Sequence, residues 1–117
     1  MITIPDTRHH FGGKVYIKEV HVPENYVLVQ HKHIFDHLSY LVKGKVELNI
    51  GGKVSLVEAP ACLLIKSNIY HGIKSLEDTI WLCIHATDCE DEERVDETLI
   101  SKNSVDKEIY AMAGSML

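Results

Sequence analysis

Short apolar runs of four to eight residues recur along most of the chain, and turn-forming residues separate them. The runs are rich in β-branched and aromatic residues, and Val46–Ile50 alternates apolar and polar positions with the period of a half-buried strand. Gly51-Gly52 then forms a two-residue hairpin loop into the next run. The pattern predicts strands over residues 14–20, 26–31, 38–43, 46–50, 54–57, 62–65, 71–75 and 79–86.

Strands at this spacing, without an alternating helical pattern, are typical of an all-β sandwich or barrel. The 117 residues suffice for one domain. We therefore predict one domain over residues 1–87, with an N-terminal arm and a core over residues 14–86. Residues 88–117 form an acidic linker and a tail that is compatible with short helices. This tail either packs on the barrel or a partner chain, or serves as an acidic interaction segment.

The amino-acid composition limits the classes of binding partner and the cellular compartment that we expect. Lys plus Arg number 12 and Asp plus Glu number 17, a net charge of −5, which argues against nucleic acid or an anionic membrane as the main partner. Neither a signal peptide at the N-terminus nor an apolar segment of about 20 residues is evident. The three cysteines contain no CxxC pair, so a disulfide framework is not expected and the compartment is predicted to be cytoplasmic.

Histidine is unusually frequent in this chain, with eight residues. His31 ends a predicted strand and His33 follows two positions later, so in an extended chain both can point to one face, roughly 6–7 Å apart. His37 follows a break and starts the next strand, whereas His71 starts a strand much later in the chain, and only a closed barrel or sandwich would bring it to the others. Neutral imidazole is a common ligand of divalent transition metals. The remaining histidines near the N-terminus or at a strand end are interpreted as bystanders: His9, His10 and His21.

At these residues the sequence resembles the cupin superfamily. The first cupin motif reads G-x5-H-x-H-x3,4-E-x6-G, and the chain has His31-Lys32-His33, three residues, His37, six residues and Gly44. The second motif commonly reads G-D-x-x-x-I-P-x-G-x-x-H, and residues 60–71 match it at the isoleucine and at the final histidine. Asn68 replaces the turn glycine, which is tolerable because Asn accepts positive φ better than most residues.

The resemblance implies a cupin-type double-stranded β-helix, or jelly-roll barrel, and a homodimer that pairs through its sheets. It also implies a divalent transition metal (Fe, Mn, Ni or Zn) bound by His31, His33, His37 and His71. The usual glutamate ligand is His37 here, so four neutral imidazoles would leave the metal its full charge and favour the reduced ion. A six-coordinate metal would keep two positions open, whereas four histidines would saturate a tetrahedral zinc in a structural site.

Strand parity suggests which side chains surround this site. If His37 points inward, so do Ser39 and Leu41. If His31 points inward, so do Val27 and Val29, and an inward His71 would bring Ile73 with it. In the last strand Trp81, Cys83 and His85 share one face, and parity alone leaves open whether that face is the inner one. An inward His85 could be a base or an additional ligand, and an outward one would be a surface residue. Tyr40 is the other candidate catalytic base, and Lys66 is the nearest candidate cation for a substrate anion.

Two classes of function fit these features, and whether the protein is an enzyme stays open at this point. The first is a metal-dependent dioxygenase of the Fe(II) type acting on a small organic molecule, with a metal-dependent isomerase of a sugar or keto acid as a variant that needs a base. The second is a non-catalytic cupin whose four-histidine metal site is structural or anchors a ligand. In both classes the partner is a small molecule.

Overall fold

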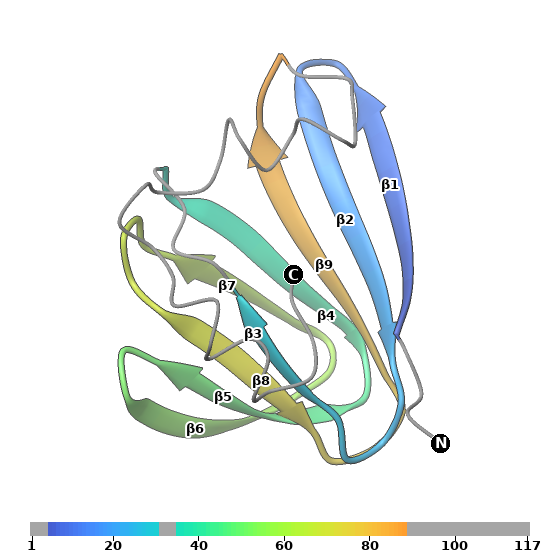
Figure 1. Cartoon of the computed structure of the whole chain (residues 1–117), viewed down its shortest axis with the longest axis vertical. Coiled ribbons are helices and arrows are strands. Elements are labelled where there is room, and N and C mark those ends of the chain that lie inside the picture. Colours follow the sequence, from blue (N-terminus) through green and yellow to red (C-terminus); the bar gives the residue numbers. More distant parts are fainter. Residues whose placement is uncertain (1–4, 31–34, 89–117) are drawn as a thin grey trace.

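The computed structural model describes residues 5–30 and 35–88, and the regular structure in these ranges consists of two antiparallel β-sheets that face each other (Figure 1). The five-stranded sheet has the order β1-β2-β9-β4-β7 and the four-stranded sheet the order β3-β8-β5-β6. The strands are β1 (Asp6–Gly12), β2 (Val15–Val22), β3 (Val27–Gln30), β4 (His37–Lys43), β5 (Lys45–Ile50), β6 (Lys53–Glu58), β7 (Ala61–Ile65), β8 (His71–Ser75) and β9 (Thr79–Ala86). Within the described ranges, no helix has the length and apolarity to cross a membrane.

The predicted all-β fold is confirmed, and the eight predicted strands correspond to β2 through β9. The exception is β1, because residues 6–12 were expected to form an arm. They pair with β2 along its length, from Asp6 opposite His21 to Gly12 opposite Val15. The strand lies at the edge of the sheet and is largely exposed, so its sequence lacks the apolar alternation of a half-buried strand. The predicted acidic linker and tail lie almost wholly in residues 89–117, outside the described residues.

The core lies between the two sheets and follows from strand alternation. Trp81 on β9 and Leu41 on β4 are fully buried in the five-stranded sheet, and Leu28 and Val46 are fully buried opposite them. Removing this much apolar surface from water is the main source of stability in such a fold. The buried cluster consists of Val20, Val22, Leu28, Leu41, Val46, Leu48, Ile73, Trp81 and Cys83.

Tight turns fix the register between neighbouring strands. Gly51 and Gly52 both have positive φ, 58° and 91°, which suits the predicted two-residue hairpin between β5 and β6. Asn68 has φ 57°, as predicted from its place at the turn position of the second motif. Gly44 joins β4 to β5 with φ 103°, and a Cβ atom at this position would lie 2.7 Å from the carbonyl oxygen of Asp78. Only glycine fits there without strain.

We predict that Gly44→Ala lowers the free energy of unfolding by about 1–3 kcal/mol, because it adds a backbone clash to a conformation that side chains rarely adopt. Gly12→Ala is the matched control, since a Cβ at Gly12 meets nothing within 4 Å. Urea unfolding of both variants measures the difference. Equal stability of the two variants would contradict the assigned role of Gly44.

Candidate functional site

Three histidines meet at one end of the two sheets. His37 is the first residue of β4, His71 the first residue of β8, and His85 the last residue but one of β9. Because β4 and β9 run antiparallel, with Leu38 opposite Ile84, the start of β4 lies beside the end of β9. β8 belongs to the facing sheet and begins at the same end (Figure 1). The topology thus gathers residues that are far apart in the sequence.

The rings of these residues form a close, buried group, which we call the histidine cluster (His37, His71 and His85). The centroids of the His37 and His71 rings are 5.4 Å apart, and those of His37 and His85 are 4.3 Å apart. Each of the three residues is only 4% exposed. The alternation in β9 places Trp81, Cys83 and His85 on the inner face. His85 is therefore an inner residue, a point that the sequence left open.

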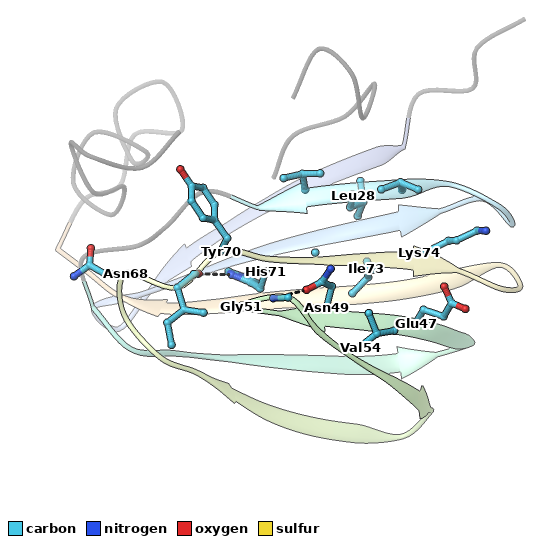
Figure 2. Close-up of a pocket in the computed structure, with 15 residues that line it drawn as sticks. Leu28, Glu47, Asn49, Gly51, Val54, Asn68, Tyr70, His71, Ile73 and Lys74 are labelled. Atoms are coloured by element: carbon cyan, nitrogen blue, oxygen red, sulfur yellow. Dashed lines mark hydrogen bonds between the residues drawn. The ribbon is translucent and has the colours of Figure 1, made fainter. Parts of the chain in front are cut away.

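Two polar contacts orient the rings of the cluster. His71 Nδ1 lies 3.3 Å from the carbonyl oxygen of Ile69, the contact drawn as a dashed line in Figure 2. A carbonyl can only accept, so Nδ1 carries the proton and the lone pair of a neutral His71 is on Nε2. Ser39 is fully buried, and its Oγ lies 3.4 Å from His37 Nε2. A backbone carbonyl that holds the second ring nitrogen is typical of metal-ligating histidine.

Burial keeps the histidine cluster neutral. It lowers the pKa of His37 to about 2, and the charges of His85 and His71 lower this pKa further. Burial also lowers the pKa of His71 to about 4, against the backbone hydrogen bond to Ile69, which raises it. The pKa of His85 falls to about 4 through burial and then through the charges of Lys18 and His71. At neutral pH all three imidazoles are therefore lone-pair donors rather than cations.

The donor set fits a transition metal, because neutral buried imidazole is a preferred ligand of Fe, Ni, Cu and Zn. In residues 5–30 and 35–88, however, no three His, Cys, Asp or Glu side chains are arranged to hold a metal ion. His31 and His33, the other two predicted ligands, lie outside the described residues. The four-histidine metal site therefore stays a prediction, with two of its members, His37 and His71, near each other.

The expected lining is confirmed on β4, whereas on β3 Val27 does not face the core. Ser39 and Leu41 are fully buried on the face that His37 shares. On β3 the fully buried residue is Leu28, whereas Val27 is 41% exposed, so the inner parity of this strand is the opposite of the one expected for Val27 and Val29. The reason is that β3 consists of apolar residues on both faces, and the sequence pattern alone cannot tell which face is inside.

Two other predicted site residues lie away from the cluster. Tyr40 is on the outer face of β4, opposite Cys62 and Leu82, because it alternates with the inward Ser39 and Leu41. The structure therefore does not bring this candidate base to the histidine cluster. Lys66 lies near Asp36, with Nζ 3.7 Å from a carboxylate oxygen, and both side chains are mostly exposed. It is a solvated surface residue.

One of the expected bystander histidines contacts the wall of the site. His9 Nδ1 lies 2.7 Å from Tyr16 Oη, and the Tyr16 ring packs between Phe11 and His85, with centroids 4.8 Å and 6.1 Å away. Tyr16 is only 1% exposed. Sequence reasoning missed this contact because it depends on β1, whose pairing with β2 has no apolar signature.

The other two bystanders belong to a polar group on the outer face. His10 Nε2 and His21 Nε2 each contact a carboxylate oxygen of Glu19, His10 at 3.0 Å. These hydrogen bonds lower the pKa of Glu19. Glu19 alternates with the buried Val20, so this group is separated from the histidine cluster by the sheet itself. The expectation that His10 and His21 stand outside the site agrees with this placement.

A groove of about 770 Å³ crosses the other sheet on its outer face (Figure 2). Exposed side chains of β5, β6 and β8 line it, among them Glu47, Asn49, Val54 and Lys74, together with Tyr70. These strand residues alternate with the buried core residues, so they point away from His37 and His85. His71, at the boundary, is the one member of the cluster that also lines this groove.

Comparisons with known proteins identify the fold. No model of a protein family matches the chain, and no curated protein matches it. Among solved structures, KdgF from Halomonas sp. is 19% identical with a TM-score of 0.61, over 73% of this chain and 80% of that one. An RmlC-like cupin from Shewanella frigidimarina is 19% identical with a TM-score of 0.53, over 73% and 87%. Salicylate 1,2-dioxygenase from Pseudoaminobacter salicylatoxidans is 4% identical with a TM-score of 0.63, over 68% of this chain and 24% of that one.

The lowered pKa values predict a loss of stability in mild acid. In the unfolded chain a histidine protonates near pH 6.5, but in the folded chain the cluster resists protonation down to about pH 4 or below. The unfolded state therefore binds more protons as the pH falls from about 6.5, and the free energy of unfolding decreases. We expect a loss of roughly 2 kcal/mol per histidine of the cluster between pH 7.5 and pH 5.0.

Urea unfolding of metal-free protein at these two pH values measures this loss. His85→Gln should remove about one third of it, since one of three titrating groups is gone. The matched control His10→Asn, on the exposed outer face, should leave it unchanged. A wild type equally stable at both pH values would show that the cluster is not buried in neutral form.

Proposed function

The chain has the cupin fold, and from this premise we propose that it binds a divalent transition metal and acts as a dioxygenase of the Fe(II) type on a small organic molecule. The observation that carries the proposal is the histidine cluster, in which imidazoles from both sheets converge and stay neutral. Neutral imidazoles without a carboxylate favour a reduced divalent ion. The likeness to the fold of salicylate 1,2-dioxygenase is compatible with this chemistry.

In the proposed site His31, His33, His37 and His71 hold the metal. When bound, the metal would supply open positions for substrate and O₂. The carbonyl oxygen of Ile69 fixes the His71 ring so that Nε2 presents its lone pair, and Ser39 supports His37 from the same strand. Both atoms of O₂ enter the substrate, which supplies the electrons itself, so no external reductant is needed.

The apolar surroundings support a reaction that is sheltered from water. Leu41 and Trp81 are fully buried on the inner faces of the strands that carry His37 and His85, and Ile65 is 1% exposed opposite His37. An apolar wall offers few side chains that could react with activated oxygen. It also lowers the local dielectric constant, which strengthens electrostatic interactions between polar side chains and the substrate. We assign His85 to orienting the His37 ring, its neighbour in the cluster.

An isomerase is less well supported than a dioxygenase. Moving a proton efficiently needs a base whose pKa lies near the working pH. His85 is the candidate base inside the barrel, and its pKa is lowered to about 4. Tyr40 points to the opposite face of β4.

The non-catalytic alternative has a specific basis, since four histidines would saturate a tetrahedral zinc and leave no position for a substrate.

We predict that the purified protein holds about one metal ion per chain and that the Fe(II)-loaded protein consumes O₂ with a substrate from a panel of small thiols, diketones and phenolics. His33→Ala and His71→Ala should lose both properties, because each removes a ligand, and losing even a residue that only supports a ligand typically costs about 10–100-fold in metal affinity. His10→Ala is the matched control on the outer face and should keep both. Elemental analysis and an oxygen electrode give the two measurements.

The outcomes separate the candidate functions. Tightly held zinc without a coordinated water, and no O₂ uptake, would support the structural alternative and contradict the dioxygenase. Stoichiometric metal retained after His33→Ala would show that the assigned ligands are wrong. If the His71→Ala variant still consumed O₂, the histidine cluster would not be required for the reaction.

We also propose that two chains pair through the outer face of the five-stranded sheet. This face carries a continuous apolar surface that includes Leu38 and Leu64, directly opposite each other and 44% and 53% exposed, with Tyr40 and Leu82 beside them. Exposed apolar patches of this kind usually mark a contact surface. The cytoplasm is the proposed compartment, since the three cysteines of the sequence contain no CxxC pair.

We predict that light scattering gives a mass of about twice 13.2 kDa and that Leu64→Glu reduces it to one chain, because the substitution places a charge in the apolar contact. Leu56→Glu is the matched control: Leu56 is 60% exposed and lies on β6, in the other sheet. A dimer that survives Leu64→Glu but dissociates with Leu56→Glu would place the interface on the four-stranded sheet.

A further inference from the structure

Lys18 points into the interior of the fold, a position that the sequence did not suggest. It lies on β2 between Tyr16 and Val20, which are 1% and 0% exposed, and it shares their face because side chains alternate along a strand. Its partner in the register is Cys83, an inner residue of β9 that is 2% exposed. Lys18 itself is half-buried, so part of its side chain remains accessible from solvent.

The position of Lys18 is next to the histidine cluster. Tyr16 is opposite His85 in the register, so Lys18 is the diagonal neighbour of His85 on the same face. Diagonal neighbours in a sheet have Cα atoms about 7–8 Å apart, within reach of a long side chain. The charge of Lys18 contributes to the lowered pKa of His85, which agrees with this proximity. His9 on β1 is opposite Lys18 in the register and is therefore a second polar residue beside it. The contact between His9 and Tyr16 holds the His9 ring at this position.

No acidic side chain is placed to neutralise Lys18 within the described ranges. The buried polar residues there are histidines, serines and a threonine, with no Asp or Glu among them. Lys18 makes none of the hydrogen bonds or ion pairs found in these ranges, whereas Arg8 pairs with Asp6 and Lys66 with Asp36. A cation on the inner face without an acidic partner is free to take a bound anion as its partner.

We propose that Lys18 binds the carboxylate of the substrate, which would place the reacting part of the molecule at the histidine cluster. The inference rests on the proposed function, and it narrows the substrate from a small organic molecule to a small carboxylate. A single ammonium group balances the single charge of a carboxylate and offers three donors to its oxygens. A phosphate dianion would bring an unbalanced negative charge against the apolar wall, so the structure favours the carboxylate.

The test measures binding of three matched pairs of probes by NMR titration: acetate, propanoate and benzoate, each with its amide. Wild type should bind at least one carboxylate about tenfold more tightly than its amide, since the charged oxygens accept stronger hydrogen bonds. Lys18→Met should abolish this preference without changing the binding of the amide, and Lys18→Arg should restore it. Lys45→Met is the matched control, because Lys45 is also half-buried but points out of the four-stranded sheet.

Three results would overturn the inference: a wild type that prefers no carboxylate over its amide, a Lys18→Met variant that keeps the preference, or inorganic phosphate that binds more tightly than every carboxylate. Metal content is measured on the same samples. Normal metal content without a Lys18-dependent preference refutes the anion site alone. A Lys18-dependent preference in protein that holds no metal and consumes no O₂ refutes the proposed function and leaves the anion site standing.

Discussion

The neutrality of three imidazoles enclosed at one end of a small barrel is the constraint on which the site depends. His37, His71 and His85 are each 4% exposed, and the His37 ring centroid lies 5.4 Å from that of His71 and 4.3 Å from that of His85. Burial opposes a proton on each ring, and on His37 the charges of the two neighbouring histidines oppose it as well. The cost of charging a group in an apolar environment keeps them as lone-pair donors. The proposed metal site depends on this neutrality, because a protonated imidazole has no lone pair to offer a metal.

The parts of the site that the sequence could predict are those fixed by local chemistry. His37 and His71 each follow a break and begin a strand, and Gly44 and Asn68 stand where positive φ is required, so spacing and turn residues suffice for them. The strands also follow from their apolar runs, apart from β1, an exposed edge strand whose pairing is visible only in the folded chain.

The remaining features depend on which face of a strand is inside, and periodicity alone does not decide this. β9 is apolar on both faces, so His85 could be assigned to the interior only from the packing of Trp81 and Cys83. For the same reason Leu28 rather than Val27 fills the core from β3. Lys18 was overlooked because a lysine is usually solvated, and only its register opposite Cys83 places it on the inner face.

The proposed metal site lies inside the barrel, and a second polar group lies on the outer face of the five-stranded sheet. His10 and His21 each contact Glu19 on the outer face of β1 and β2. Anomalous diffraction from a crystal of the iron- or zinc-loaded protein distinguishes the two locations directly. We expect one strong peak beside His37 and His71, inside the barrel. A peak beside Glu19, or no peak near the histidine cluster, would contradict it.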